Sequence, residues 1–104
     1  MSLFDDNTQV LSDLAARGVD LSHPLTVDFE HLLPDQASAV ALAFQLSGLG
    51  FHTRSWRDET QTWNVTASKV MVPTCEEITA IEEQLDTLAR DRGGRADGWG
   101  FLEG

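Results

Sequence analysis

The spacing of apolar residues changes several times along the chain, and each change predicts a new element. Between about residues 5 and 18, apolar side chains recur at helical spacing after Asp6, where the sequence resembles a capping box, and Gly18 ends the pattern. From Leu25 to about Leu33 the period becomes two, which is typical of a strand with one covered face. The pattern therefore predicts a short N-terminal helix followed by a strand.

A second helix is predicted to begin at Pro34-Asp35 and to end near Gly48 and Gly50. Its surface is apolar on most sides. One apolar row consists of Ala37, Val40, Ala41 and Phe44, and this row is widened by Leu42, Leu46 and Leu49. Only a narrow polar stripe remains on this helix.

A β-hairpin is predicted where residues 51–57 and 62–72 alternate with a period of two on either side of a polar break at residues 58–61. The apolar parity of the second strand shifts between Ala67 and Val70. Because an extra residue in one strand moves the following side chains to the other face, this shift predicts a bulge.

The clearest amphipathic helix is predicted after Thr74, which begins a capping box with Glu77. Its apolar positions follow at helical spacing and are Ile78, Ile81, Leu85 and Leu88. Glycines end this helix. The final segment, residues 95–103, is strand-like, with Trp99 and Phe101 on one side.

The predicted order is helix, then strand, helix, strand, strand, helix, strand. After the first helix this is a βαββαβ string, which packs most simply as a four-stranded antiparallel sheet with two helices on one face. We therefore expect an α+β fold, a ferredoxin-like two-layer sandwich with an extra N-terminal helix. A chain of 104 residues has the size of one domain, with the first helix at about 5–18 and the core at about 24–103.

Charge narrows the classes of partner. Seventeen Asp and Glu residues against seven Lys and Arg residues give a formal net charge of -10. Such a molecule repels polyanions and favours basic or neutral protein surfaces, so we expect no direct binding of nucleic acid. The longest apolar run, residues 39–46, is far shorter than the roughly 20 residues of a membrane span. With Cys75 as the single cysteine and no recognisable signal peptide, the sequence predicts a cytoplasmic protein that does not engage a membrane.

Residues with reactive side chains do not form a motif. His23, His31 and His52 lack the spacing of metal ligands, and Gly48-Leu49-Gly50 leads into a strand instead of out of one, unlike a phosphate-binding loop. Cys75 lies at the start of a helix, where the dipole favours a thiolate, but a small residue filling a buried helix face explains its position equally well. We therefore expect no enzyme, no catalytic residue, no metal and no cofactor.

The third predicted helix is strongly acidic. Its acidic residues are Glu76, Glu77, Glu82, Glu83, Asp86 and Asp91, which we expect on its solvent side and in its first turn. One interpretation is a solvated face whose first turn is stabilised by the helix dipole. The other is a docking face for a basic segment of another protein.

The tryptophans fall on predicted strands. Trp63 is in phase with the apolar residues of its strand and is expected in the core. Trp56 is expected to be partly exposed on the sheet face that the helices leave open, together with His52 and Arg54, a composition typical of interface hot spots.

Glycines flank Trp99 in the last strand, at Gly98 and Gly100, and Asp97 precedes them. Glycine there allows a bulge or the close approach of another chain. The ring either plugs the end of the core or receives a partner. The candidate partner-binding residues are therefore Asp97, Gly98, Trp99, Gly100, Trp56, Glu76, Glu83 and Asp86.

The closing Asp97-Gly98-Trp99-Gly100, placed directly after the helix of residues 78–89, resembles the end of the ribonuclease E inhibitor domain, the regulator of ribonuclease activity B family. The passage 43–51 and the strand before Pro73 match as well, so the likeness covers about residues 25–103. The resemblance implies the fold predicted above. It also implies a small acidic bacterial protein that binds ribonuclease E and lowers its activity without catalysis of its own.

Two functions follow as expectations. The first is a non-enzymatic regulator that docks on a protein, with ribonuclease E as the specific candidate, and so modulates RNA turnover. The alternative is a small-molecule-sensing regulatory domain with a ligand at a sheet edge or a dimer interface, because a fold alone does not determine function.

Overall fold

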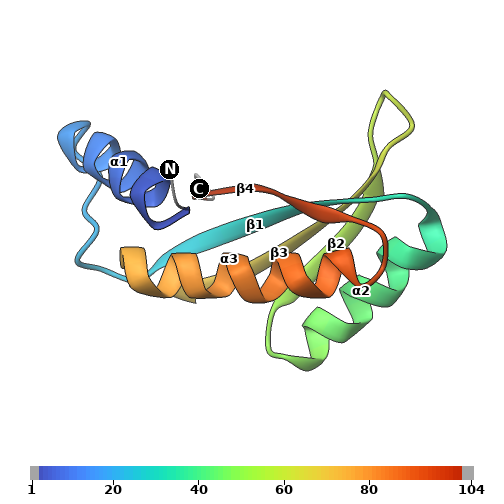
Figure 1. The fold of residues 1–104 in the computed structure, drawn as a ribbon. Helices are drawn as coiled ribbons and strands as arrows, with labels where there is room; N and C mark the ends of the chain where they lie inside the picture. The colour runs from blue at the N-terminus through green and yellow to red at the C-terminus, as the bar shows by residue number, and fades with distance from the viewer. Residues whose placement is uncertain (1–2, 102–104) are drawn as a thin grey trace.

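The computed structural model describes residues 3–101, with the side chains of residues 6–101, and forms an α+β two-layer sandwich (Figure 1). The elements follow in the predicted order. The helices of this region are α1 (Leu3–Ala16), α2 (Gln36–Gly48) and α3 (Cys75–Arg90), and its strands are β1 (Leu25–Leu33), β2 (His52–Arg57), β3 (Trp63–Met71) and β4 (Arg95–Phe101).

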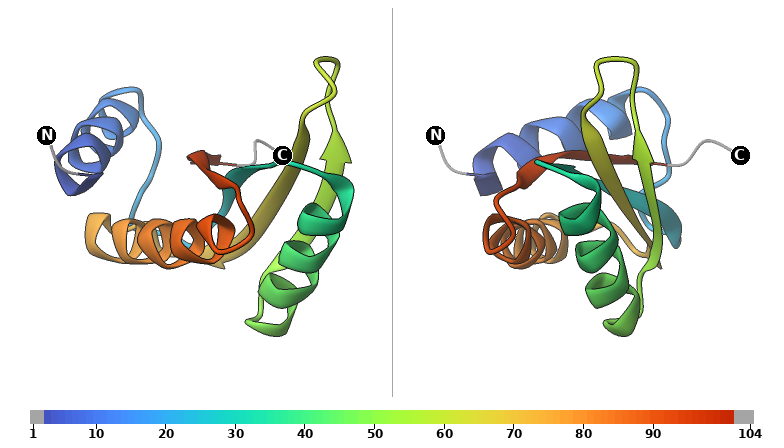
Figure 2. Two further views of the ribbon diagram at one scale, coloured as in Figure 1. Left: turned by 45° about the vertical axis from the view of Figure 1, so that its right-hand side comes forward. Right: turned by 90° about the vertical axis from the view of Figure 1, so that its right-hand side faces the viewer.

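The four strands form one antiparallel sheet in the order β2-β3-β1-β4, so β2 and β4 are its edges. This is the strand order of the predicted ferredoxin-like arrangement. Helices α2 and α3 cover one face of the sheet, and α1 lies near β4 and packs against α3 (Figure 2). The other face of the sheet is left open, as expected.

The core lies between the sheet and the two covering helices. Alternate residues of β1 are buried against the helices, and they are Val27, Phe29, His31 and Leu33. The helices contribute Leu42, Leu46, Ile78 and Leu85, all fully buried. The period of two that predicted β1 is therefore the alternation between a packed face and an open face.

The bulge predicted in the second hairpin strand is wrong. The pairing of β1 with β3 runs without a break from Leu25 opposite Met71 to Leu33 opposite Trp63. The apolar parity shifts because Val70 lies on the open face, where its side chain is 65% exposed. The predicted change of register was therefore an exposed apolar residue in a regular strand.

A real irregularity occurs between β1 and β4. Phe29 pairs with Trp99 but His31 pairs with Ala96, so β4 holds one residue more than β1 over this stretch. Gly98 lies in this bulge with φ 101°, in the region of backbone conformation that favours glycine. The bulge allowed by the flanking glycines is therefore present, and it places Ala96 and Trp99 on the same face of the sheet.

Helix α2 begins as the sequence predicts, with Asp35 accepting a hydrogen bond of 2.8 Å from the backbone N–H of Ser38. The face that packs on the sheet, however, carries Ala39, Leu42 and Leu46. The apolar row through Val40 and Phe44 points outward. Because the helix is apolar on nearly every side, its sequence alone does not determine which side is buried.

Helices α1 and α3 each differ from expectation in one detail. Helix α1 begins at Leu3, so Asp6 lies inside the helix and does not cap it. Thr74 caps α3 as predicted, accepting a hydrogen bond of 3.2 Å from the backbone N–H of Glu77. Glu82 of that helix is buried, not on its solvent side. The predicted end of the core at residue 103 lies outside the described residues.

Candidate functional site at the last strand

An acidic groove of about 390 Å³ lies between α3 and the first half of β4. It forms because α3 leads through Gly93-Gly94 directly into β4, so the C-terminal half of the helix runs beside the strand. Its acidic residues are Glu82, Glu83, Asp86 and Asp97, and its basic residues are Arg90 and Arg95. Carboxylates therefore outnumber guanidinium groups in this groove.

The side chain of Asp86 connects the two elements that form the acidic groove, α3 and β4. Its Oδ1 accepts a hydrogen bond of 2.8 Å from the backbone N–H of Ala96, and its Oδ2 lies 2.7 Å from Nε of Arg90. Partial burial opposes ionisation, but the hydrogen bond from Ala96 and the charge of Arg90 outweigh it and hold the pKa of Asp86 below its ordinary value. Asp86 thus ties β4 to α3, whereas Glu83 and Asp97 are exposed to solvent.

Glu82, at the inner end of the groove, is buried and takes part in a polar network. Its Oε1 accepts a hydrogen bond of 2.8 Å from Nδ2 of Asn7, which also donates to Oγ1 of Thr79 at 3.0 Å. Burial raises the pKa of Glu82 above its ordinary value, against the effect of the bond from Asn7. This network fastens α1 to α3.

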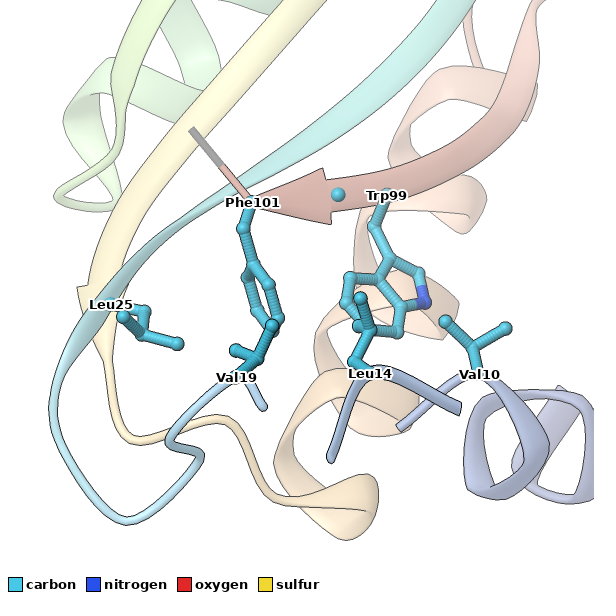
Figure 3. A pocket seen from close by; sticks show the side chains of 7 residues that line it. Val10, Leu14, Val19, Leu25, Trp99 and Phe101 are labelled. Carbon is cyan, nitrogen blue, oxygen red and sulfur yellow. The ribbon is translucent and has the colours of Figure 1, made fainter. Parts of the chain in front are cut away.

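An apolar pocket of about 350 Å³ adjoins the second half of β4 (Figure 3). Figure 3 shows the ring of Trp99 directed toward Val10 and Leu14 of α1, and the ring of Phe101 directed toward Val19. The two rings pack edge to face with centroids 5.6 Å apart. Leu25 and Gly100 complete the lining. The groove and the pocket therefore follow each other along β4.

Most of the candidate residues from the sequence gather at β4. Glu83, Asp86, Asp97 and Gly98 line the acidic groove, and Trp99 and Gly100 line the apolar pocket. Glu76 is exposed on the first turn of α3 and lies outside both. Trp56 lies on β2, at the opposite edge of the sheet. The structure thus brings six of the eight candidates together along one strand and its neighbours.

Trp56 belongs to a different surface, the open face of the sheet. His52, Arg54 and Trp56 alternate along β2 on this face, and the guanidinium of Arg54 lies 5.9 Å from the centre of the Trp56 ring. The indole Nε1 donates to Oγ1 of Thr66 at 3.3 Å, and Thr66 in turn donates to Glu30 at 2.7 Å. The indole of Trp56 is thus held in place by a hydrogen bond, and the acidic Glu30 shares this face.

Sequence reasoning missed the residues that hold the site in place. Asn7 reaches partners 72 and 75 positions away, and no local pattern identifies such a contact. The apolar residues Val10 and Leu14 were predicted on the first helix but not against Trp99. Their helical spacing indicated that one side of α1 is covered, and this was the available signal.

Within the part of the chain that the structure describes, no group of three or more His, Cys, Asp or Glu side chains is placed to hold a metal ion. Among the helices of that same part, none combines the length and the hydropathy needed to cross a membrane.

The family model described as regulator of ribonuclease activity B matches residues 4–101, from α1 to the end of β4. No curated protein matches the sequence. The family match includes the acidic groove and the apolar pocket.

Proposed function

The chain belongs to the regulator of ribonuclease activity B family, and on this premise we propose that it is a non-enzymatic regulator that binds a ribonuclease, with ribonuclease E as the specific target. The observation that carries the proposal is the family match over residues 4–101. The expected consequence of binding is a lower rate of RNA cleavage by the enzyme.

The net charge supports binding to the enzyme and not to its substrate. A protein with a formal charge of -10 repels RNA at long range, whereas it attracts a basic segment of a protein. Electrostatic complementarity of this kind mainly accelerates encounter and selects the partner. Regulation by competition for RNA is therefore disfavoured.

The surface along β4 is where we place the contact. A Lys or Arg side chain in the acidic groove would meet the exposed carboxylates of Glu83 and Asp97. A neighbouring apolar side chain would fill the pocket beside Trp99, and a tryptophan in such a pocket is typical of an interface hot spot. The proposed partner segment therefore combines basic and apolar residues.

Binding to purified ribonuclease E tests this function. We expect an association that weakens between about 50 mM and about 500 mM salt, because screening reduces the attraction of exposed charges. In an RNA cleavage assay, the chain should lower the rate of the enzyme and show no cleavage by itself. A folded protein that does not associate at low salt would refute the target.

A charge-neutralising pair of variants tests the place of contact. Glu83→Gln combined with Asp97→Asn should weaken binding by about fivefold, the effect of two exposed charge pairs. The matched control is Glu59→Gln combined with Asp91→Asn, which changes the net charge equally at exposed positions outside the groove. An equal effect of both pairs would place the contact elsewhere.

The apolar pocket also favours a second candidate function, the sensing of a small apolar molecule. A volume of about 350 Å³ lies in the range of ligand sites, roughly 300 to 1,000 Å³. A ligand that binds only the folded state raises the melting temperature. Val10→Phe, which would reduce the pocket, should remove that rise. If no apolar metabolite shifts the melting temperature, this candidate function fails.

A further inference from the structure

The outward side of α2 is an apolar surface that the proposed function does not use. Its residues Ala37, Val40, Ala41 and Phe44 follow at i, i+3, i+4 and i+7, so they share one side of the helix. Phe44 is 83% exposed and Val40 is 51% exposed, Ala37 is exposed as well, and Ala41 is half-buried. Monomeric proteins leave single apolar residues in solvent, but an exposed row at helical spacing indicates a contact.

This side of α2 is complementary to itself. In an antiparallel pair of α2 helices with a two-fold axis between positions 40 and 41, Phe44 faces Ala37 of the second copy, and Val40 faces its Ala41. A large residue therefore meets a small one at each position, which is how packed helices interdigitate. Gly48 continues the row and adds no side chain. We propose that α2 forms the interface of a homodimer.

The absence of charge on α2 supports a second copy of this chain as the occupant. Of the helices that the structure describes, α2 has no ionisable side chain, whereas the whole chain carries a formal charge of -10. Two copies repel each other through most surfaces, and at α2 no carboxylate opposes their approach. A basic partner would gain nothing from this neutral side, because the carboxylates that attract it line the groove at β4.

The size of the surface predicts a weak dimer. A helix of 13 residues is about 20 Å long, so one side of it buries on the order of a few hundred Å² per copy. Interfaces of that size are transient, and we expect a dissociation constant of roughly 10 µM to 1 mM. Because salt screens the repulsion between two anionic copies, higher salt should strengthen the dimer. Binding to a ribonuclease shows the opposite salt dependence, so the two associations are distinguishable.

Sedimentation equilibrium from about 10 µM to about 1 mM protein tests the proposal. The unmodified chain should pass from monomer to dimer, and more readily at high salt. Phe44→Glu should weaken the dimer by at least about tenfold, because it places a charge in the apolar interface. Val70→Glu is the matched control, since it adds the same charge at an exposed valine on the open face of the sheet and should have no such effect.

A mixing experiment tests the antiparallel arrangement itself. Phe44→Glu in one copy would face Ala37→Arg in the other, so a mixture of the two variants should form a heterodimer although each alone associates poorly. Both positions are exposed, and circular dichroism checks that the variants fold. A chain that stays monomeric throughout, a dimer unaffected by Phe44→Glu, or a mixture without heterodimer would each overturn the proposal.

Discussion

The indole Nε1 of Trp99 donates a hydrogen bond of 2.8 Å to Oδ1 of Asn7, and this bond joins the last strand to the first helix. The amide nitrogen of the same Asn7 donates to Glu82 and to Thr79 of α3. One buried amide therefore connects three elements and uses both its acceptor and its donor atoms. The wall of the apolar pocket depends on this side chain, because Val10 and Leu14 lie on the helix that it fastens.

Replacement of this amide tests its structural role. Asn7→Ala leaves the carboxyl of Glu82 and the indole N–H of Trp99 without their partner, so we expect the free energy of unfolding to fall by about 2 to 4 kcal/mol. Urea denaturation measures the change. Gln9→Ala on the same helix is the control, since Gln9 is exposed and bonds only to Asp13 among the contacts of its side chain that the structure describes. Equal effects of the two variants would contradict the network.

The buried carboxyl of Glu82 predicts a pH dependence of stability. Burial raises its pKa in the folded state above the ordinary value of 4.5. The folded state therefore binds more protons than the unfolded state between these two values. The favourable contribution of the protonated carboxyl is complete below about pH 4.5 and is lost as pH rises through the folded pKa.

The variant Glu82→Gln isolates this effect, because a glutamine oxygen can still accept the bond from Asn7 without carrying a charge. We expect the variant to be more stable than the unmodified chain at about pH 7, and the advantage to shrink toward about pH 4. Urea midpoints measured across this range give the difference. An advantage that does not change with pH would show that the carboxyl titrates alike in both states.

Sequence periodicity predicted the elements whose two sides differ in polarity. β1 alternates apolar and polar side chains, and its bounds were predicted at Leu25 and Leu33, where the structure has them. α2 lacks such contrast, so the sequence predicted the helix but did not show that Phe44 faces solvent. In β3 the exposed Val70 was misinterpreted, because periodicity reports apolar character and not burial.

The candidate site was predictable only as far as neighbours in sequence are neighbours in space. The groove combines α3 and β4, which follow each other through one short turn. Asp86 was a candidate as part of the acidic helix, and Asp97 as part of the motif around Trp99. The contact between Trp99 and Asn7 spans 92 positions and depends on how α1 returns to the sheet. Local propensities carry no information about such a contact.

The hydrogen bonds in the turn between β2 and β3 predict a low pKa for the carboxyl group of Asp58. Asp58 accepts hydrogen bonds from Thr60, Asn64 and Thr62, with the Thr60 hydroxyl at 2.6 Å. These bonds, the one from the Thr60 hydroxyl first, lower its pKa to about 2. Its contribution to stability is present above the ordinary value of 3.8 and is lost as pH falls through about 2.

Carboxyl-carbon NMR titration measures the pKa of Asp58 directly, and Asp58→Asn removes its signal and assigns it. The variant should also lose less stability than the unmodified chain between about pH 4 and about pH 2, because it has no carboxylate to protonate there. A titration of Asp58 at the ordinary value of 3.8 would contradict the hydrogen-bonded turn.

The turn from α3 into β4 depends on Gly94, whose backbone N–H donates a bond of 2.8 Å to the carbonyl of Ala89. A Cβ at this position would collide with the carbonyl oxygen of Leu32 and with the side chain of Leu33. The carbonyl belongs to the sheet and cannot withdraw without disturbing it, so Gly94→Ala should lower the free energy of unfolding by about 2 to 4 kcal/mol. At Gly100, within β4, a Cβ would meet no heavy atom within 4 Å. Urea denaturation of Gly100→Ala should therefore show a change in the free energy of unfolding within about 0.5 kcal/mol. A loss at Gly94 no larger than that at Gly100 would contradict the close approach of the turn to β1.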